Sequence, residues 1–136
     1  MSEYLIAGVG TKALIEHEGK LLIVHDGRWE VPGGRMHVGE QLKESLRREV
    51  LEEVGLDVIV GELYTVMQYK TLKSGDERIT MVYHCTLSDP TQIVRPDGEE
   101  VTEARWIEQV SDMDGMEFFT EMGEMIKEYL RTKRVV

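Results

Sequence analysis

The sequence predicts an α/β fold, a mixed sheet with helices packed on it, formed by residues 1–136 as a single domain. The first observation is the order of periodic segments, which runs strands, helix, strands, helix. The second is that 136 residues with 41% hydrophobic content can bury one core and are atypical of disorder. In chain order we expect strands at 4–16, 21–25 and 29–31, a helix at 40–54, strands at 57–69, 78–87 and 101–107, and a helix at 116–131.

The first three strands are predicted from apolar runs bounded by turn residues. Gly19 separates the first two runs and makes them a hairpin, and Asp26-Gly27 ends the second run. Pro32-Gly33-Gly34 stops the third, because proline disfavours helix at the residue before it. Paired glycines also permit positive φ and a close approach of the backbone to a ligand.

The two helices are predicted from apolar residues at helical spacing. Leu42, Leu46 and Val50 fall at i, i+4 and i+8 and share one stripe, and Gly55 suits the C′ position that follows the helix. The last helix shows roughly the same spacing, with Phe119, Met122, Ile126, Tyr129 and Leu130.

Between the helices, Ser74-Gly75-Asp76 joins two extended segments into a long hairpin. Asp89-Pro90 and Pro96-Asp97-Gly98 bracket a loop before the last strand. Cys85 lies in the second arm of the hairpin. Because it is the single cysteine of the chain it forms no intrachain disulfide, and we expect a small core residue.

The net charge of −10 restricts the possible partners. No stripe of Lys and Arg is present, so bulk nucleic acid is not expected as a partner. An acidic protein can hold a polyphosphate only if cations lie between the two, so the charge favours divalent metal. The sequence contains no signal-peptide pattern and no run of 18 apolar residues, so we expect no membrane span and a cytoplasmic protein.

The helix at 40–54 carries three glutamates at neighbouring positions. Glu49 and Glu53 are four residues apart and Glu49 and Glu52 three apart, so all three face one sector, and Glu53 falls close to the apolar stripe. Two like charges about 4 Å apart repel by roughly 4 kcal/mol at an effective dielectric near 20. The alternative is a solvated acidic face with an Arg48–Glu52 ion pair, which would contribute only about 0.3–0.5 kcal/mol. Stability gives no reason to crowd acids beside apolar residues, so the spacing favours a bound cation.

Carboxylate oxygens favour Mg²⁺ or Mn²⁺ over Zn²⁺ as that cation. No cluster of Cys and His competes for it: the four histidines are scattered, and only His37 lies near the helix.

The segment Gly34–Leu56 reads G-x5-E-x7-R-E-V-x-E-E-x-G-L and resembles the Nudix box at every specified position. The lead-in at residues 29–33 and the order of strands and helices are also similar to this family, so the resemblance covers the whole chain. It implies an α/β/α sandwich, with the Nudix helix on one side of the mixed sheet and a C-terminal helix. It also implies a hydrolase of nucleoside diphosphate-linked compounds that requires Mg²⁺ or Mn²⁺.

The resemblance further implies roles for individual residues. The metal ligands it implies are Glu49, Glu52, Glu53 and the carbonyl of Gly34. Arg48 is expected to orient a catalytic glutamate by pairing with it, and Glu40 to support the loop and the helix start. The general base is left open between Glu49, Glu52 and an acid from a later loop. Glu100 and Glu103 are the candidates there, with a solvated acidic turn as the alternative for both.

The substrate is less strongly indicated. Lys70 and Thr71 stand where ADP-ribose hydrolases of the family have a proline, and Tyr69 lies too close to the box to match the tyrosine of dinucleoside polyphosphate hydrolases. The chain looks most like the MutT-like enzymes, which convert a nucleoside triphosphate to a monophosphate and pyrophosphate. ADP-ribose, nucleotide sugars and dinucleotides are the alternatives.

No substrate-binding residue is assigned. Trp29, Tyr64, Tyr69 and Tyr83 are candidates to stack on a base, but aromatic residues in strands more often belong to the core. The rival to an enzyme is a nucleotide-binding module without turnover, which usually lacks some box carboxylates; this chain has them all. The sequence indicates no oligomeric state.

Overall fold

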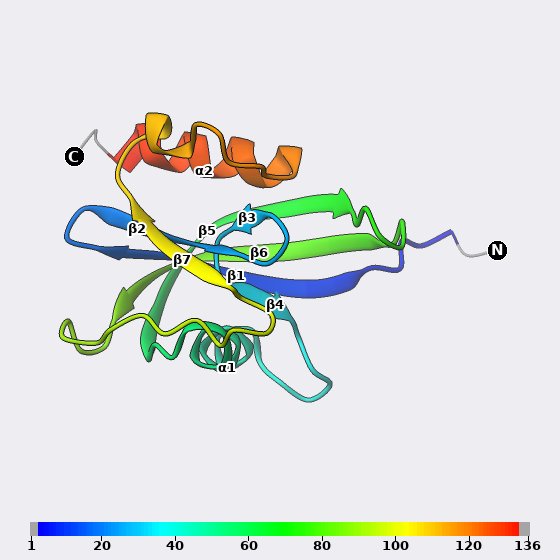
Figure 1. Cartoon of the computed structure of the whole chain (residues 1–136). Helices are drawn as coiled ribbons and strands as arrows, with labels where there is room; N and C mark the ends of the chain where they lie inside the picture. The colour runs from blue at the N-terminus through cyan, green and yellow to red at the C-terminus, as the bar shows by residue number, and fades with distance from the viewer. Residues whose placement is uncertain (1–2, 134–136) are drawn as a thin grey trace.

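The computed structural model describes residues 3–133 and is built on a mixed sheet (Figure 1). Its elements are β1 (Gly8–His17), β2 (Lys20–His25), β3 (Trp29–Glu30), β4 (Gly33–Arg35), α1 (Leu42–Val54), β5 (Val58–Lys70), β6 (Glu77–Leu87), β7 (Glu103–Ile107), the 3₁₀ helix η1 (Val110–Met113) and α2 (Thr120–Thr132). The strand order is β3-β2-β1-β6-β5, while β4 pairs with β1 and β7 pairs with β2. β1 and β6 are parallel, from the pair Gly8–Arg78 to the pair Ile15–Cys85, and the other pairs are antiparallel.

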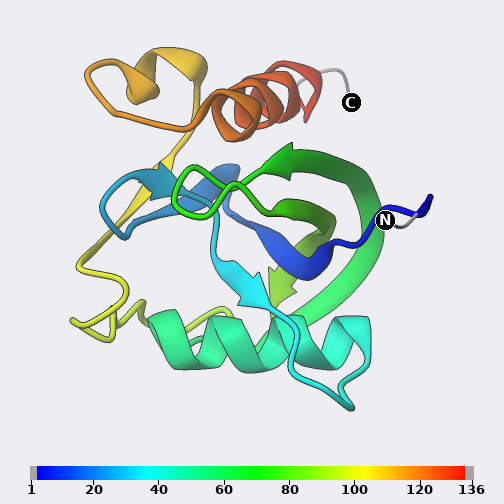
Figure 2. The ribbon, with the colours of Figure 1, turned by 90° about the vertical axis from the view of Figure 1, so that its right-hand side faces the viewer.

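The two helices cover opposite faces of the sheet (Figures 1 and 2). Side chains alternate along a strand, so β1 supplies both cores: Ala13 and Ile15 face α1, and Leu14 faces α2. β2 does the same with Leu22 and Leu21. Burial on both faces explains the continuous apolar runs of these strands, and it confirms the α/β/α sandwich.

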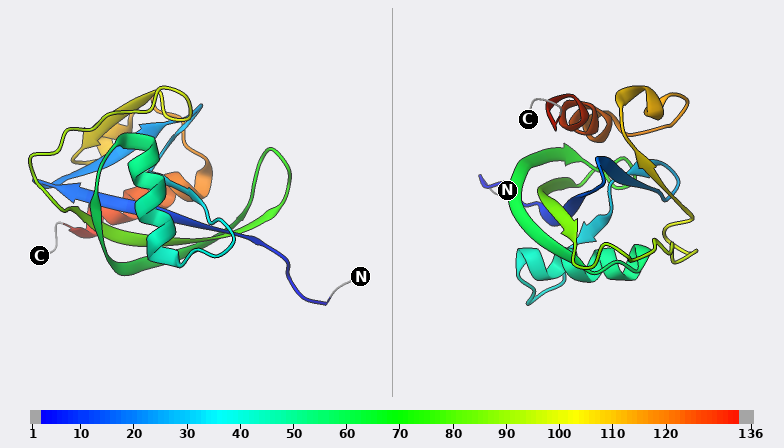
Figure 3. Two further views of the ribbon diagram at one scale, coloured as in Figure 1. Left: turned by 90° about the horizontal axis from the view of Figure 1, so that it is seen from below. Right: turned by 90° about the vertical axis from the view of Figure 1, so that its left-hand side faces the viewer.

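Helix α1 runs across the strands beneath the sheet (Figure 3). Leu46, Val50 and Val54 are fully buried in the core on this face, as the helical spacing predicted. Gly55 follows the helix with a left-handed φ of 69°, and its N–H donates to the carbonyl of Leu51 at 3.0 Å. Cys85 is buried in the same core, as expected. Within residues 3–133, no helix has the length and apolar character needed to cross a membrane.

Several element boundaries differ from the sequence prediction. β1 begins at Gly8 rather than Tyr4, because its pairing with β6 starts at Gly8–Arg78; Tyr4 and Ile6 before it are 80% and 82% exposed. The remaining shifts are small: α1 begins at Leu42, β5 at Val58, β6 at Glu77, β7 at Glu103 and α2 at Thr120. Helix η1 lies in a segment without a periodic pattern and was not expected.

The largest difference concerns the glycine segment. The sequence predicted that Pro32-Gly33-Gly34 would end the extended chain, but Gly33–Arg35 continues it as β4. β4 pairs antiparallel with residues 10–12 of β1. Glycine disfavours strands locally, and here a partner strand distant in sequence supplies the backbone hydrogen bonds that offset this preference.

Replacement of Leu46 by alanine should lower the free energy of unfolding by about 2–5 kcal/mol, because it leaves a cavity between α1 and the sheet. Leu51→Ala is the matched control, since the Leu51 side chain of the same helix is 56% exposed. Urea unfolding monitored by circular dichroism measures both variants, and equal losses would contradict the assignment of the buried face.

Candidate functional site

The site begins where β4 meets α1. Gly33 has a φ of 140°, and a Cβ placed there would lie 2.1 Å from the carbonyl oxygen of Thr11. A Cβ on Gly34 would lie 2.8 Å from the carboxyl carbon of Glu49. Position 33 therefore requires glycine, whereas a side chain at Gly34 would displace the Glu49 carboxyl group, and the absence of side chains brings the backbone of β4 directly against the glutamates of the helix.

Two of the three box glutamates are buried at this contact. Glu49 and Glu53 are only 8% and 6% exposed, although both are acidic. The N–H of Gly33 donates to Oε1 of Glu53 at 3.1 Å. The expectation that Glu53 lies beside the apolar stripe is thus confirmed.

A third carboxylate comes from the loop before β7. One oxygen from each of Glu49, Glu53 and Glu100 can be chosen so that all three lie within 4.8 Å of one another. Glu103, which the sequence left as an equal candidate, begins β7 instead and pairs with Arg105 at 2.8 Å. Of the two acids in this loop, the structure therefore brings Glu100 to the buried glutamates.

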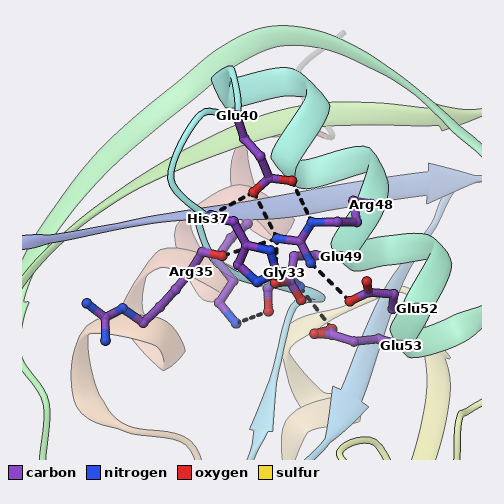
Figure 4. A network of polar contacts seen from close by, with 9 residues as sticks. Gly33, Arg35, His37, Glu40, Arg48, Glu49, Glu52 and Glu53 are labelled. Atoms are coloured by element: carbon purple, nitrogen blue, oxygen red, sulfur yellow. Dashed lines mark hydrogen bonds and ion pairs between the residues drawn. The ribbon is translucent and has the colours of Figure 1, made fainter.

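Arg48 connects the remaining acids of the segment (Figure 4). Its guanidinium lies 2.5 Å from Oε2 of Glu40, 3.1 Å from Oε1 of Glu49 and 3.0 Å from Oε2 of Glu52. The Glu52 side chain is 58% exposed and lies on Arg48, outside the group formed by Glu49, Glu53 and Glu100. The helical wheel placed all three box glutamates in one sector, and the observed side chains divide them into two buried and one exposed.

Glu40 supports the loop that leads into α1. Its Oε1 accepts a hydrogen bond from the backbone N–H of His37 at 2.7 Å, and its other oxygen binds Arg48. Hydrogen bonds from Arg48 and His37 lower the pKa of Glu40 to about 2. Glu40 therefore stays ionised at any ordinary pH and holds Arg48 in place.

The buried glutamates have the opposite electrostatics. Burial raises the pKa of Glu53 to about 8, with a further contribution from the charge of Glu49, against the opposing effects of Lys12 and the Gly33 N–H. Burial also raises the pKa of Glu49, although Arg48 opposes this. Ionising both side chains without a counter-ion is unfavourable, and a cation bound between them would reverse that balance.

Lys12 is a part of the site that the sequence reasoning missed. This lysine of β1 is 9% exposed, forms an ion pair with Glu30 and donates to the carbonyl of Gly33 at 3.1 Å. Burial alone would lower the pKa of Lys12, but the charges of Glu30 and Glu53 outweigh it and raise the pKa above its ordinary value. A lysine inside the apolar run of a central strand was the available signal, because such a charge requires a buried partner.

A hollow of about 1230 Å³ opens at the edge of the sheet next to β4. Its walls come from β3, β4, the β5–β6 hairpin and the segment that enters α2, and its basic residues are Arg28, Arg35, Lys70, Lys73 and Arg78.

The aromatic residues Tyr69, Trp29 and Phe119 also line this hollow. Trp29 is 7% exposed and its ring is covered by Arg105, so of the proposed stacking residues only Tyr69 is half-buried at this hollow. Tyr64 lines a separate groove against α2, and Tyr83 is buried in the core.

The residues at the β4–α1 contact fit a divalent cation. The donors are carboxylate oxygens of Glu49, Glu53 and Glu100, which hard cations such as Mg²⁺ and Mn²⁺ prefer.

Comparison with known proteins identifies the family. The model of the NUDIX domain matches residues 7–116, and the chain belongs to this family. A MutT-like protein of Streptomyces ambofaciens is 32% identical over 105 residues, which cover 75% of this chain and 61% of the relative. The nucleoside triphosphatase NudI of Salmonella agona is 34% identical over 84 residues, which cover 52% of this chain and 60% of that protein. The chain thus spans about 60% of the length of these relatives.

Solved structures share the fold. A NUDIX hydrolase from Nitrosomonas europaea aligns with a TM-score of 0.78 at 20% identity, covering 94% of this chain and 91% of that one. The MutT protein of Methanosarcina mazei aligns with a TM-score of 0.76 at 22% identity, covering 98% and 99% of the two chains. These likenesses confirm the arrangement of sheet and helices.

Without divalent cation, the contribution of Glu53 to stability should decrease as the pH rises from about 5 to about 8. The folded protein retains the Glu53 proton up to a pKa of about 8, whereas the unfolded chain releases it near pH 4.5, so the raised pKa favours folding only at low pH. Mg²⁺ should therefore raise the melting temperature more at pH 8 than at pH 5, because it binds the deprotonated carboxylates. Thermal unfolding across this pH range measures the effect.

The variant Glu53→Gln is the control for this measurement. It removes the titrating group and keeps the side-chain volume, so the difference between the two proteins isolates Glu53. A pH dependence that is the same in both would show that Glu53 does not hold a proton at neutral pH.

Proposed function

We propose that this chain is a divalent-metal-dependent hydrolase that cleaves a phosphoanhydride bond in a nucleoside diphosphate-linked compound. The substrate that we propose is a nucleoside triphosphate, which is hydrolysed to a monophosphate and pyrophosphate. The observation that carries this proposal is the cluster of Glu49, Glu53 and Glu100 beside Gly34, together with a hollow of about 1230 Å³ that is lined by Arg35, the residue after Gly34. Two buried carboxylates with an exposed third beside them repel one another, and the group is suited to hold a cation against a phosphate chain.

Mg²⁺ or Mn²⁺ is the proposed cofactor, and its proposed ligands are Glu49, Glu52, Glu53 and the carbonyl of Gly34, with Glu100 as an additional one. The bound ion would supply charge neutralisation at the phosphate oxygens and a lowered pKa for the attacking water. The protein positions the carboxylates: the backbone N–H of Gly33 donates a hydrogen bond to Glu53, and Arg48 forms an ion pair with Glu49.

Arg48, Glu49 and Glu52 are the proposed catalytic residues. Glu52 differs from the buried pair because its side chain is exposed, where it can accept a proton from water. Arg48 holds its carboxylate at 3.0 Å and is itself anchored by Glu40, so the position of Glu52 depends on a chain of two ion pairs. This arrangement favours Glu52 as the general base.

The choice of nucleoside triphosphates is supported by the relatives named as nucleoside triphosphatase NudI, which share about one third of their residues with this chain over the aligned segment. ADP-ribose, nucleotide sugars and dinucleotides are the alternative substrates. A panel of these compounds with the purified protein and Mg²⁺, with release of pyrophosphate or monophosphate as readout, distinguishes them. Absence of Mg²⁺-dependent turnover of every compound would refute the proposal, and tight binding without product would indicate a nucleotide-binding module.

Glu52→Gln should reduce kcat by a factor of about 10²–10⁴ while the melting temperature stays close to that of the wild type, because a proton acceptor is lost from an exposed position. Glu44→Gln is the matched control, since Glu44 is an exposed glutamate of the same helix. Steady-state kinetics on the best substrate measures both variants. Near-normal turnover by Glu52→Gln would remove Glu52 from the mechanism.

A further inference from the structure

Two arginines, one on each of the strands that flank β1, bring their side chains close to the same residue of β1, Gly8. Arg35 of β4 pairs with Gly10, and Arg78 of β6 pairs with Gly8, so the two strands approach β1 from opposite sides. A Cβ built on Gly8 would lie 2.9 Å from Nη2 of Arg35 and 3.2 Å from Nε of Arg78. The glycine therefore leaves the space in which the two guanidinium groups come together.

Neither guanidinium has an acidic partner among residues 3–133. Arg47, Arg48 and Arg105 all form ion pairs, but no carboxylate lies within 4.0 Å of Arg35 or Arg78. Nε of Arg78 is buried and has no hydrogen-bond acceptor. Two adjacent positive charges with an unsatisfied buried donor are unfavourable for stability, and an anion would relieve both defects.

The surrounding acids do not supply that anion. The large hollow is also lined by Asp26, Glu30, Asp76 and Glu121. Glu30 is already paired with Lys12. Asp76 and Glu77 line a smaller hollow of about 270 Å³ on the other side of the two arginines, and neither forms an ion pair with them.

The position of the pair relates it to the proposed cation site. Arg35 directly follows Gly34, whose backbone contacts Glu49. Figure 4 shows the Arg35 side chain extending away from Glu49, Glu52 and Glu53. A phosphate bound by Arg35 would therefore be a different phosphate from the one next to the glutamates.

We propose that Arg35 and Arg78 bind the terminal phosphate of the substrate and thereby select nucleoside triphosphates over compounds whose diphosphate is capped at both ends. This inference rests on the proposed function and specifies its substrate class. A terminal phosphate carries up to two negative charges near neutral pH and offers three oxygens, which match two guanidinium groups. Each phosphate of ADP-ribose or a nucleotide sugar is internal and carries a single charge, so it should bind Arg35 and Arg78 more weakly.

Binding of inorganic tripolyphosphate in the absence of divalent metal tests the site without any need for turnover. Isothermal titration should show that the wild type binds tripolyphosphate. The affinity of Arg35→Gln and of Arg78→Gln should be about 10- to 100-fold lower, because each variant loses a charge-assisted hydrogen bond. Arg131→Gln, at an exposed position near the end of α2, controls for the change in net charge and should bind like the wild type. Unchanged affinity in both pocket variants would overturn the proposal.

Gly8→Ala tests the geometry with both arginines kept. The methyl group would displace only the flexible ends of two side chains, so the protein should fold and lose tripolyphosphate affinity. Wild-type affinity in this variant, with a normal melting temperature, would count against a site formed by the crossing of the two side chains.

The specificity is tested by kcat/KM for ATP and for ADP-ribose in the wild type, Arg35→Gln and Arg78→Gln. The variants should lose about 10- to 100-fold on ATP and much less on ADP-ribose. An equal loss on both compounds would refute selection of a terminal phosphate while leaving the hydrolase proposal intact. If the wild type hydrolyses no compound of the substrate panel, the proposed function fails, and the tripolyphosphate titration still decides whether the anion site exists.

Discussion

The contact between β4 and α1 is the constraint on which the rest of the site depends. Gly33 donates its N–H to Glu53, and the Gly34 backbone lies so close to Glu49 that a Cβ would collide with its carboxyl group. Lys12 supports the same strand by donating a hydrogen bond to the carbonyl of Gly33. A strand with ordinary side chains would push the helix away and separate the glutamates from the backbone, so the two glycines set the dimensions of the site.

This contact places acids where stability alone would not. Glu49 and Glu53 lie at the border of a core formed by Leu46, Val50 and Val54, and burial raises the pKa of both carboxyl groups. Arg48 offsets part of the cost at Glu49 and Lys12 offsets part of it at Glu53, but the pKa of both acids stays raised. The fold thus keeps a local electrostatic strain, which is typical of sites that bind ions.

The parts that the sequence predicted are those determined by short-range periodicity. The spacing of Leu42, Leu46 and Val50 was sufficient to orient α1 and to place Glu53 beside the apolar stripe. The strand β4 and the buried Lys12–Glu30 pair were missed, because each depends on a partner about twenty residues away in the chain. The approach of Arg35 and Arg78 was equally inaccessible, since it follows from the parallel register of β1 with β6, which no local pattern encodes.

The choice between Glu100 and Glu103 shows how capping and site formation are linked. The last turn of α1 leaves carbonyl groups without helical partners. Those of Glu53 and Val54 accept hydrogen bonds from the backbone N–H groups of Asp97 and Arg95, at 2.9 and 2.8 Å. Asp97 then turns the chain by accepting hydrogen bonds from the N–H groups of two residues that follow it, at 3.1 and 2.9 Å.

That turn carries Glu100 back toward the helix that the loop has just capped. The register of β7 with β2 fixes Glu103 further along, beside Arg105 on the strand. The loop must follow this path to satisfy the end of α1, so the hydrogen bonds that complete the helix also bring the third carboxylate to the buried pair. An acidic turn that the sequence leaves ambiguous is in this way assigned by the backbone requirements of the helix next to it.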